Sequence, residues 1–283
     1  MKGQFASIAF VVALATACTP LQLNPSHQEG LMGGVDPGLT TLLNQDGKLG
    51  FEKFRNYSGP HKAFVICMDG TWSWVQKHES PEKAIEAALT RVRRNSGDAP
   101  CRPYAVDSQF ISAGPSIRGN VDEARVALAA AELKRKSYWD EDRETSIPPT
   151  TSVNRIFHAP TPMAIPGAKV ILTTDLRQML SSSEPPLLIN VLFGPTISIP
   201  GSVSNNGIGS AFSSKGEVDA QEFLRRHLRE KSRPVVFYCL SWQCWLSYNA
   251  ALRAASWGYN NVYWYRGGIF AWFDAGLPFV LEK

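Results

Sequence analysis

The chain has 283 residues, of which 44% are hydrophobic and 19% charged, and this balance is typical of a globular protein and excludes wholesale disorder. The net charge is +4 and is spread along the chain without a block of like charges, so no clustered basic stripe for a nucleic acid is present. A single apolar run approaches membrane length and stands at the N-terminus, which excludes a polytopic membrane protein.

The N-terminus has the pattern of an export signal. Lys2 precedes the apolar run 5–14, and the Ala-Thr-Ala of residues 15–17 fits the small-x-small cleavage rule. Residues 1–17 are therefore predicted to be a signal peptide. Ordinary cleavage is one outcome, and a lipid on Cys18 is the other, because the segment that ends at Cys18 resembles a bacterial lipobox. We expect a periplasmic protein whose only membrane attachment would be that lipid.

The remaining cysteines suit an oxidising compartment. Setting Cys18 aside leaves an even number from the five in the chain. Cys67 and Cys101 lie on predicted strands that flank one helix, so we expect a structural disulfide between them in an exported protein. A free-thiol sensor is the alternative.

Turn-forming and apolar segments predict the organisation of the first half. Residues 18–50 are rich in Gly, Pro, Asn and Ser and are predicted to form a tether. Residues 51–115 are predicted to form a small α+β domain, to which we assign a binding or docking role. Its expected elements are strands at 63–67, 71–75 and 101–111, an Asp69-Gly70 hairpin turn, and a helix opened by Ser80-Pro81. Residues 116–157 are predicted to form a helical connector and linker, with a helix at 120–136.

From residue 158 onward, strands alternate with helices. Strands are expected at 169–172, 187–192, 235–238 and 261–265, and helices at 174–180, 219–231, 245–257 and 269–274. The residues between 201 and 216 are expected to form a long loop. This alternation predicts an α/β fold, a doubly wound parallel sheet over 158–283.

Cys239 stands directly after the apolar strand 235–238, and a helix follows shortly after it. In a parallel sheet, ligands bind where the carboxyl end of a strand faces a helix N-terminus. The positive end of the helix dipole and free backbone N–H groups favour the thiolate, which is the nucleophilic form. Cys239 is therefore a candidate catalytic nucleophile.

The surrounding motifs resemble a rhodanese domain. They are FYCLSWQCW at 237–245, Ala250-Ala251-Leu252, Gly258-Tyr259, Gly267-Gly268 and WFDAGLP at 272–278. The resemblance covers about 158–283 and implies a sulfurtransferase that takes sulfur from thiosulfate or a persulfide and passes it to an acceptor thiol. It implies that Cys239 carries the persulfide. It also implies an active-site loop of backbone amides formed by Leu240, Ser241, Trp242, Gln243 and Cys244.

More narrowly, Cys239 with the Cys244-Trp245 pair resembles a periplasmic rhodanese-like group associated with quinoprotein (PQQ-dependent) alcohol catabolism and named for a Cys-x-x-Cys-Trp motif. This resemblance implies a periplasmic quinoprotein dehydrogenase, or its cytochrome, as a partner. No residue argues for binding PQQ itself, so no cofactor is expected.

Two other functions stay open beside sulfur transfer. Cys239 and Cys244 could form a dithiol/disulfide redox pair at a helix N-terminus. Alternatively, the domain is a catalytically inert binding module, because the loop carries the aromatic Trp242 and no basic side chain for an anion. The five histidines show no metal-ligand spacing, so no metal site is expected.

Overall fold

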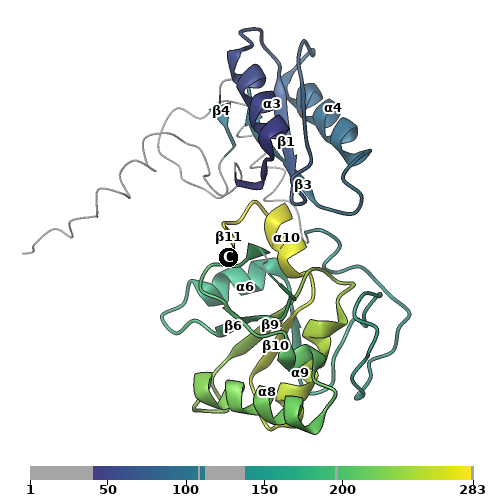
Figure 1. Cartoon of the computed structure of the whole chain (residues 1–283), viewed down its shortest axis with the longest axis vertical. Coiled ribbons are helices and arrows are strands. Elements are labelled where there is room, and N and C mark those ends of the chain that lie inside the picture. Colours follow the sequence, from purple (N-terminus) through teal and green to yellow (C-terminus); the bar gives the residue numbers. More distant parts are fainter. Residues whose placement is uncertain (1–40, 108, 112–137, 195–196, 282–283) are drawn as a thin grey trace, which may run out of the picture. The chain divides into compact units, whose positions relative to one another are not determined.

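The computed structural model describes residues 41–107, 109–111, 138–194 and 197–281, all within the unit Val35–Lys283 (Figure 1). The predicted signal peptide, Cys18, most of the predicted tether and the helix expected at 120–136 lie outside these residues. The first half of the chain forms an antiparallel sheet and the second half a parallel one. A further two-stranded pairing joins β7 (Ile197–Ser198) to β11 (Val280–Leu281).

The first sheet has the strand order β2-β1-β3-β4, with antiparallel neighbours throughout. The predicted hairpin is confirmed, since β1 and β2 pair with Val65 opposite Ser73. The predicted helix start is also confirmed: the Ser80 side chain accepts a hydrogen bond from the Lys83 N–H at 3.3 Å. The elements are α3 (Gln45–Asn56), β1 (Ala63–Cys67), β2 (Trp72–Val75), α4 (Pro81–Arg93), β3 (Cys101–Val106) and β4 (Gln109–Phe110).

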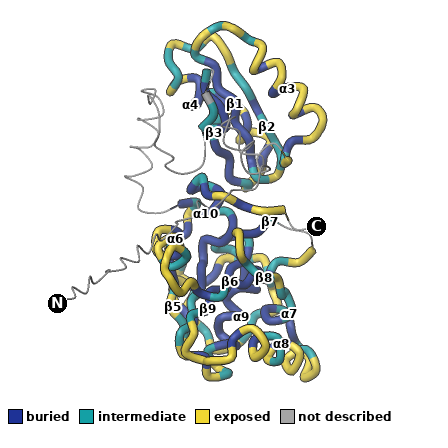
Figure 2. The backbone as a smooth tube through the Cα atoms, turned by 90° about the vertical axis from the view of Figure 1, so that its left-hand side faces the viewer, coloured by how far each residue is buried: buried dark blue, intermediate teal, exposed yellow. Residues whose placement is uncertain are grey.

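Strand β1 is buried along its whole length because both faces of the sheet are covered. Phe64 packs with the side chains of α3 on one face, and Val65 packs with those of α4 on the other. In Figure 2 this strand is dark along its length, whereas the outward side of α3 is exposed. The apolar run 63–67 therefore reflects a strand covered by two helices.

Helix α3 begins inside the segment 18–50 that the sequence predicts to be a tether. Asn44 caps it by accepting a hydrogen bond from the Gly47 N–H at 2.8 Å. Glycine-rich composition suggested a loop, but Gly47 and Gly50 serve helix packing. A Cβ atom on them would lie 2.9 and 2.2 Å from atoms of the Trp72 ring. The glycines let α3 approach that ring closely.

The second sheet is parallel and has the strand order β5-β10-β9-β6-β8. The predicted fold class, a doubly wound parallel α/β sheet, is confirmed. Its strands are β5 (Lys169–Ile171), β6 (Leu187–Asn190), β8 (Val203–Ser204), β9 (Val235–Tyr238) and β10 (Val262–Tyr265). Its helices are α6 (Thr173–Leu180), α7 (Gly207–Ser210), α8 (Ser214–His227), α9 (Trp245–Ser256) and α10 (Gly268–Asp274).

Alternation along β9 sorts the side chains onto two faces of this sheet. Phe237 lies in the core formed with α7, α8 and α9, whereas Tyr238 lies in the core formed with α6 and α10. Because helices cover both faces, β9 is buried at every position. This makes β9 a central strand whose carboxyl end opens onto the loops above the sheet.

One helix start was predicted wrongly. The Asp219–Glu222 segment has the form of a capping box, but it lies inside α8, which begins at Ser214. The cap is Ser213, whose side chain accepts a hydrogen bond from the Gly216 N–H at 3.1 Å. Strand β8 and helix α7 also interrupt the loop expected at 201–216. Among the described residues, no helix is both long and apolar enough to span a membrane.

Candidate functional site

Cys239 follows the last residue of β9 and lies at the centre of the sheet's carboxyl edge, because β9 runs between β10 and β6. The segment from Leu240 to Cys244 then connects β9 to α9, which begins at Trp245. The Cys239 side chain is completely buried. The structure thus places the predicted nucleophile at a strand end that faces a helix N-terminus.

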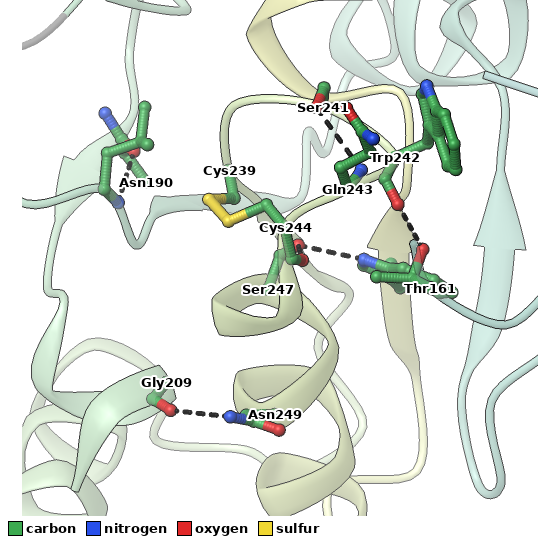
Figure 3. Close-up of a disulfide and its surroundings, with 12 residues drawn as sticks. Thr161, Asn190, Gly209, Cys239, Ser241, Trp242, Gln243, Cys244, Ser247 and Asn249 are labelled. Atoms are coloured by element: carbon green, nitrogen blue, oxygen red, sulfur yellow. Dashed lines mark hydrogen bonds between the residues drawn. A yellow bond between two sulfur atoms is a disulfide. The ribbon is translucent and has the colours of Figure 1, made fainter. Parts of the chain in front are cut away.

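Cys239 and Cys244 are joined by a disulfide (Figure 3). Their Cα atoms are 6.1 Å apart, within the limit of about 7 Å that a disulfide requires. Cys244 is the N-cap residue of α9 and is 6% exposed. Both sulfur atoms are therefore enclosed, and in this state neither is a free thiol.

A second disulfide joins Cys67 to Cys101 in the N-terminal sheet. The two residues stand opposite each other on the antiparallel strands β1 and β3. This pair is separate from the C-terminal sheet that carries Cys239.

On one side, the segment 157–161 holds the loop by main-chain contacts. The Ala159 N–H donates to the Gln243 carbonyl at 2.9 Å, and the Trp245 N–H donates to the Phe157 carbonyl at 3.0 Å. The Thr161 hydroxyl donates to the Trp242 carbonyl (Figure 3). These bonds fix the second half of the loop without involving either sulfur.

On the other side, the Gly267-Gly268 turn brings α10 against the loop. The Ile269 N–H donates to the Cys239 carbonyl and the Phe270 N–H to the Leu240 carbonyl, each at 2.9 Å. Gly268 has φ +61°, and a Cβ atom there would lie 2.4 Å from the Cys239 carbonyl oxygen. Glycine is therefore required for this approach.

Three successive loop amides have no hydrogen-bond acceptor among the described residues. Within the described part of the chain, the N–H groups of Leu240, Ser241 and Trp242 donate no hydrogen bond. The next two amides are used inside the loop: the Gln243 N–H donates to the Ser241 hydroxyl and the Cys244 N–H to the Ser241 carbonyl. Consecutive free N–H groups are a common device for binding anions.

Two arginines from other segments of the chain lie close to the loop. The loop has no basic side chain, but the guanidinium carbons of Arg143 and Arg266 lie 5.3 and 5.6 Å from the centre of the Trp242 ring. Trp242 itself is half-buried, and its indole points away from the disulfide (Figure 3). The predicted aromatic residue of the loop therefore contacts cations rather than covering the sulfur atoms.

Arg266 is buried, and its guanidinium is held by main-chain and hydroxyl oxygens. It donates to the Glu141 carbonyl at 3.0 Å and to both the carbonyl and the hydroxyl oxygen of Thr161 at 3.2 Å. Burial lowers the pKa of Arg266 to about 10, and the nearby charge of Asp142 opposes that shift. Among the described residues no carboxylate bonds to this guanidinium, so its charge is only partly balanced.

Sequence reasoning missed Arg266, although a usable signal exists. Tyr265 of β10 and Tyr238 of β9 are partners in register. Arg266 therefore follows its strand as Cys239 follows its own, and both stand at the same edge of the sheet. The strand-end argument that selected Cys239 also applies to Arg266.

Glu141 is buried beside this edge, and its carboxylate is fully engaged. It accepts hydrogen bonds from the Thr173 N–H at 2.8 Å, the Thr173 hydroxyl at 2.7 Å and the Tyr138 N–H at 3.1 Å. Burial raises the pKa of Glu141, while the Thr173 hydrogen bonds oppose the shift. Burial also raises the pKa of Tyr265, whose hydroxyl lies 2.6 Å from that of Thr173.

The structure also places His158 at the site, which the sequence did not. His158 pairs with Cys244 as an isolated antiparallel bridge, a main-chain contact that again involves neither sulfur. Across the described ranges, no group of three or more His, Cys, Asp or Glu side chains could hold a metal ion.

Residues 196–275 match the family model of the rhodanese-like domain. The match includes Cys239, the whole loop and the Gly267-Gly268 turn. Together with the parallel sheet, it identifies the C-terminal domain as a rhodanese-like α/β domain. No curated protein matches the chain.

The solved structures that are similar to this chain include the following three. Thiosulfate sulfurtransferase from Pseudomonas aeruginosa is 16% identical over 41% of this chain and 21% of its own, with a TM-score of 0.33. The polysulfide-sulfur transferase homodimer from Wolinella succinogenes is 16% identical over 40% of this chain and 79% of its own, with a TM-score of 0.31. An uncharacterized protein from Saccharomyces cerevisiae is 19% identical over 38% of this chain and 91% of its own, with a TM-score of 0.28. The match thus spans about a fifth of the Pseudomonas protein (21%).

Replacing Gly268 by alanine should destabilise the domain for two reasons. The left-handed backbone costs a side-chain-bearing residue about 1–2 kcal/mol, and the overlap with the Cys239 carbonyl adds about 1–3 kcal/mol. Gly194→Ala is the matched control, because Gly194 has φ +74° but a Cβ atom there meets nothing within 4 Å. Urea unfolding of both variants measures the difference. Equal losses of stability would contradict the close approach of α10 to the loop.

Glu141→Gln should flatten the pH dependence of stability. The pKa of Glu141 is raised in the folded chain, so its contribution is fully present below the unfolded pKa and is lost as pH rises through the folded pKa. The free energy of unfolding should therefore decline over that interval, and less steeply in Glu141→Gln. Urea unfolding at a series of pH values tests this, with the exposed Glu144→Gln as the control. The same decline in all three proteins would rule out Glu141 as its source.

Proposed function

We propose that the C-terminal domain transfers sulfane sulfur through a persulfide on Cys239. The observation that carries this proposal is the position of Cys239, at the end of a central strand and followed by three unbonded loop amides and the start of α9. The family match over 196–275 supports the same function. The substrates would be a small sulfur donor, such as thiosulfate or a persulfide, and an acceptor thiol.

The reaction begins from the reduced cysteine pair. The Cys239 thiolate attacks the outer sulfur of thiosulfate, a bond forms between the two sulfur atoms, and sulfite leaves with the electron pair of the broken sulfur–sulfur bond. The unbonded N–H groups of Leu240, Ser241 and Trp242 are suited to stabilising the persulfide anion. An acceptor thiolate then takes the outer sulfur, and the Cys239 thiolate is restored.

Arg266 supplies the charge that this chemistry needs at the sheet edge. Its guanidinium is buried and has no carboxylate bonded to it among the described residues. A buried cation interacts with a nearby anion more strongly than an exposed one, because water screens it less. We infer that Arg266 favours the thiolate of Cys239 and compensates for the missing basic residue in the loop.

A dithiol/disulfide redox function is the second candidate, and the Cys239–Cys244 disulfide favours it. In the oxidised protein Cys239 is not a thiolate and cannot act as the nucleophile toward a sulfur donor, so sulfur transfer requires prior reduction of this bond. The two candidates therefore use the same sulfur atom in two oxidation states. Sulfur uptake by the reduced protein distinguishes between them.

We further propose that the protein acts in the periplasm, held to a membrane only if Cys18 carries a lipid. The apolar run 5–14 and the cleavage pattern before Cys18 support export. Cys239 with the Cys244-Trp245 pair resembles the periplasmic rhodanese-like group described above. This resemblance supports a role in quinoprotein-dependent alcohol catabolism, with a quinoprotein dehydrogenase or its cytochrome as the partner.

Cys239→Ser should abolish sulfur transfer, and Cys244→Ser should preserve it. With thiosulfate as donor and cyanide as acceptor, we expect Cys239→Ser to lose about 10³-fold or more in thiocyanate formation, because it lacks the nucleophile. Mass spectrometry of reduced Cys244→Ser should find one added sulfur on the peptide that carries Cys239. Undiminished thiocyanate formation by Cys239→Ser would contradict the proposal, as would an unmodified peptide in Cys244→Ser.

A further inference from the structure

We propose that Cys244 resolves the Cys239 persulfide, so that the domain releases its sulfane sulfur as hydrosulfide while the two cysteines close into their disulfide. This activity is sulfane-sulfur reduction, distinct from transfer to an acceptor thiol. The inference rests on the proposed function, because it begins from the persulfide on Cys239.

The disulfide shows that the Cys244 sulfur reaches the inner sulfur of Cys239. Apart from its own carbon, the Cys239 sulfur bonds to one further atom at a time. That atom is the Cys244 sulfur in the disulfide and the outer sulfur in a persulfide. The two states are therefore mutually exclusive, and attack by Cys244 on Cys239 must expel the outer sulfur.

The approach of the two residues does not depend on the disulfide. The Cys239 carbonyl is held by the Ile269 N–H at 2.9 Å, and the Cys244 N–H donates to the Ser241 carbonyl at 3.0 Å. Cys244 also pairs with His158 through the main chain. These bonds keep the Cα atoms near their 6.1 Å separation when the sulfur–sulfur bond is open. A thiol held at this distance attacks as an intramolecular nucleophile, which is a large kinetic advantage over a free thiol.

Burial favours the internal thiol over an external one. In the disulfide state Cys239 is completely buried and Cys244 is 6% exposed, so the two sulfur atoms share one enclosed site. On reduction the Cys244 thiol already stands beside the Cys239 sulfur, whereas a thiol of another protein must enter this site from outside. Cys244 is therefore the first thiol that a persulfide on Cys239 meets.

The step balances without an added oxidant. The Cys239 thiolate first takes the outer sulfur from thiosulfate and sulfite leaves. The Cys244 thiol then attacks the inner sulfur, a bond forms between the two cysteines, and the bond to the outer sulfur breaks. The outer sulfur departs with that electron pair and with the proton of Cys244 as hydrosulfide. Two electrons pass from the thiols to the sulfane sulfur, and an external dithiol reductant would be needed only for a second turnover.

The test uses the full chain, reduced with a dithiol, freed of reductant and mixed with thiosulfate without oxygen. We expect about one hydrosulfide ion per chain, together with the loss of two hydrogens from the Cys239–Cys244 peptide pair. Cys244→Ser should release no hydrosulfide and should keep one added sulfur on Cys239, which cyanide removes as thiocyanate. The double variant Cys67→Ser/Cys101→Ser should release hydrosulfide as the wild type does.

The outcomes separate the two proposals. Persulfide retained on wild-type Cys239 without hydrosulfide would overturn the resolving role of Cys244 and leave sulfur transfer standing. Equal hydrosulfide release by Cys244→Ser would also overturn it. Failure of both the wild type and Cys244→Ser to take sulfur would overturn the persulfide itself. Should the double variant not fold, peptide mapping of the wild type still shows which cysteine pair has become oxidised.

Discussion

The loop from Leu240 to Cys244 is held by main-chain hydrogen bonds from two directions, and the chemistry proposed for the domain depends on these bonds. The segment 157–161 holds Gln243 and Trp245, while the N–H groups that begin α10 hold the carbonyls of Cys239 and Leu240. Each bond pairs a backbone N–H with a backbone carbonyl that the regular helices and strands leave unpaired. A loop fixed in this way presents its remaining N–H groups in a set direction, which is the condition for electrostatic preorganisation. It also fixes the distance between two cysteines that are not neighbours in the sequence.

Much of the C-terminal fold could be predicted because its signals are local. The strand 235–238 is apolar at every position, and a central parallel strand is buried on both faces. Cys239 could be chosen because it follows that strand. The N-terminal hairpin could be predicted for the same reason, since an Asp-Gly turn between two strand-like runs is a short-range signal. In these cases the residues that decide the structure lie next to one another.

The rest depends on partners far away in the sequence. Arg266 donates hydrogen bonds to Glu141 and Thr161, which precede it by 125 and 105 residues. No local sequence pattern predicts those contacts. The glycines of α3 favoured a loop when read alone, and only the Trp72 ring against which they pack explains a helix there. The sequence likewise presented a loop without a basic side chain, whereas the structure brings two guanidinium groups to Trp242 from other segments.

The charge of Arg266 has a further consequence for the balance between the two states of the cysteine pair. In the disulfide both sulfur atoms are neutral, so among the described residues the charge of the buried guanidinium is offset only in part, by the nearby carboxylate of Asp142. A thiolate formed on Cys239 by reduction would add a negative charge at the strand end next to the one that Arg266 follows. Stabilising the reduced form of a dithiol raises its reduction potential, which makes the disulfide a stronger oxidant. The role inferred for Arg266 in favouring the Cys239 thiolate therefore also implies a Cys239–Cys244 disulfide that accepts electrons more readily.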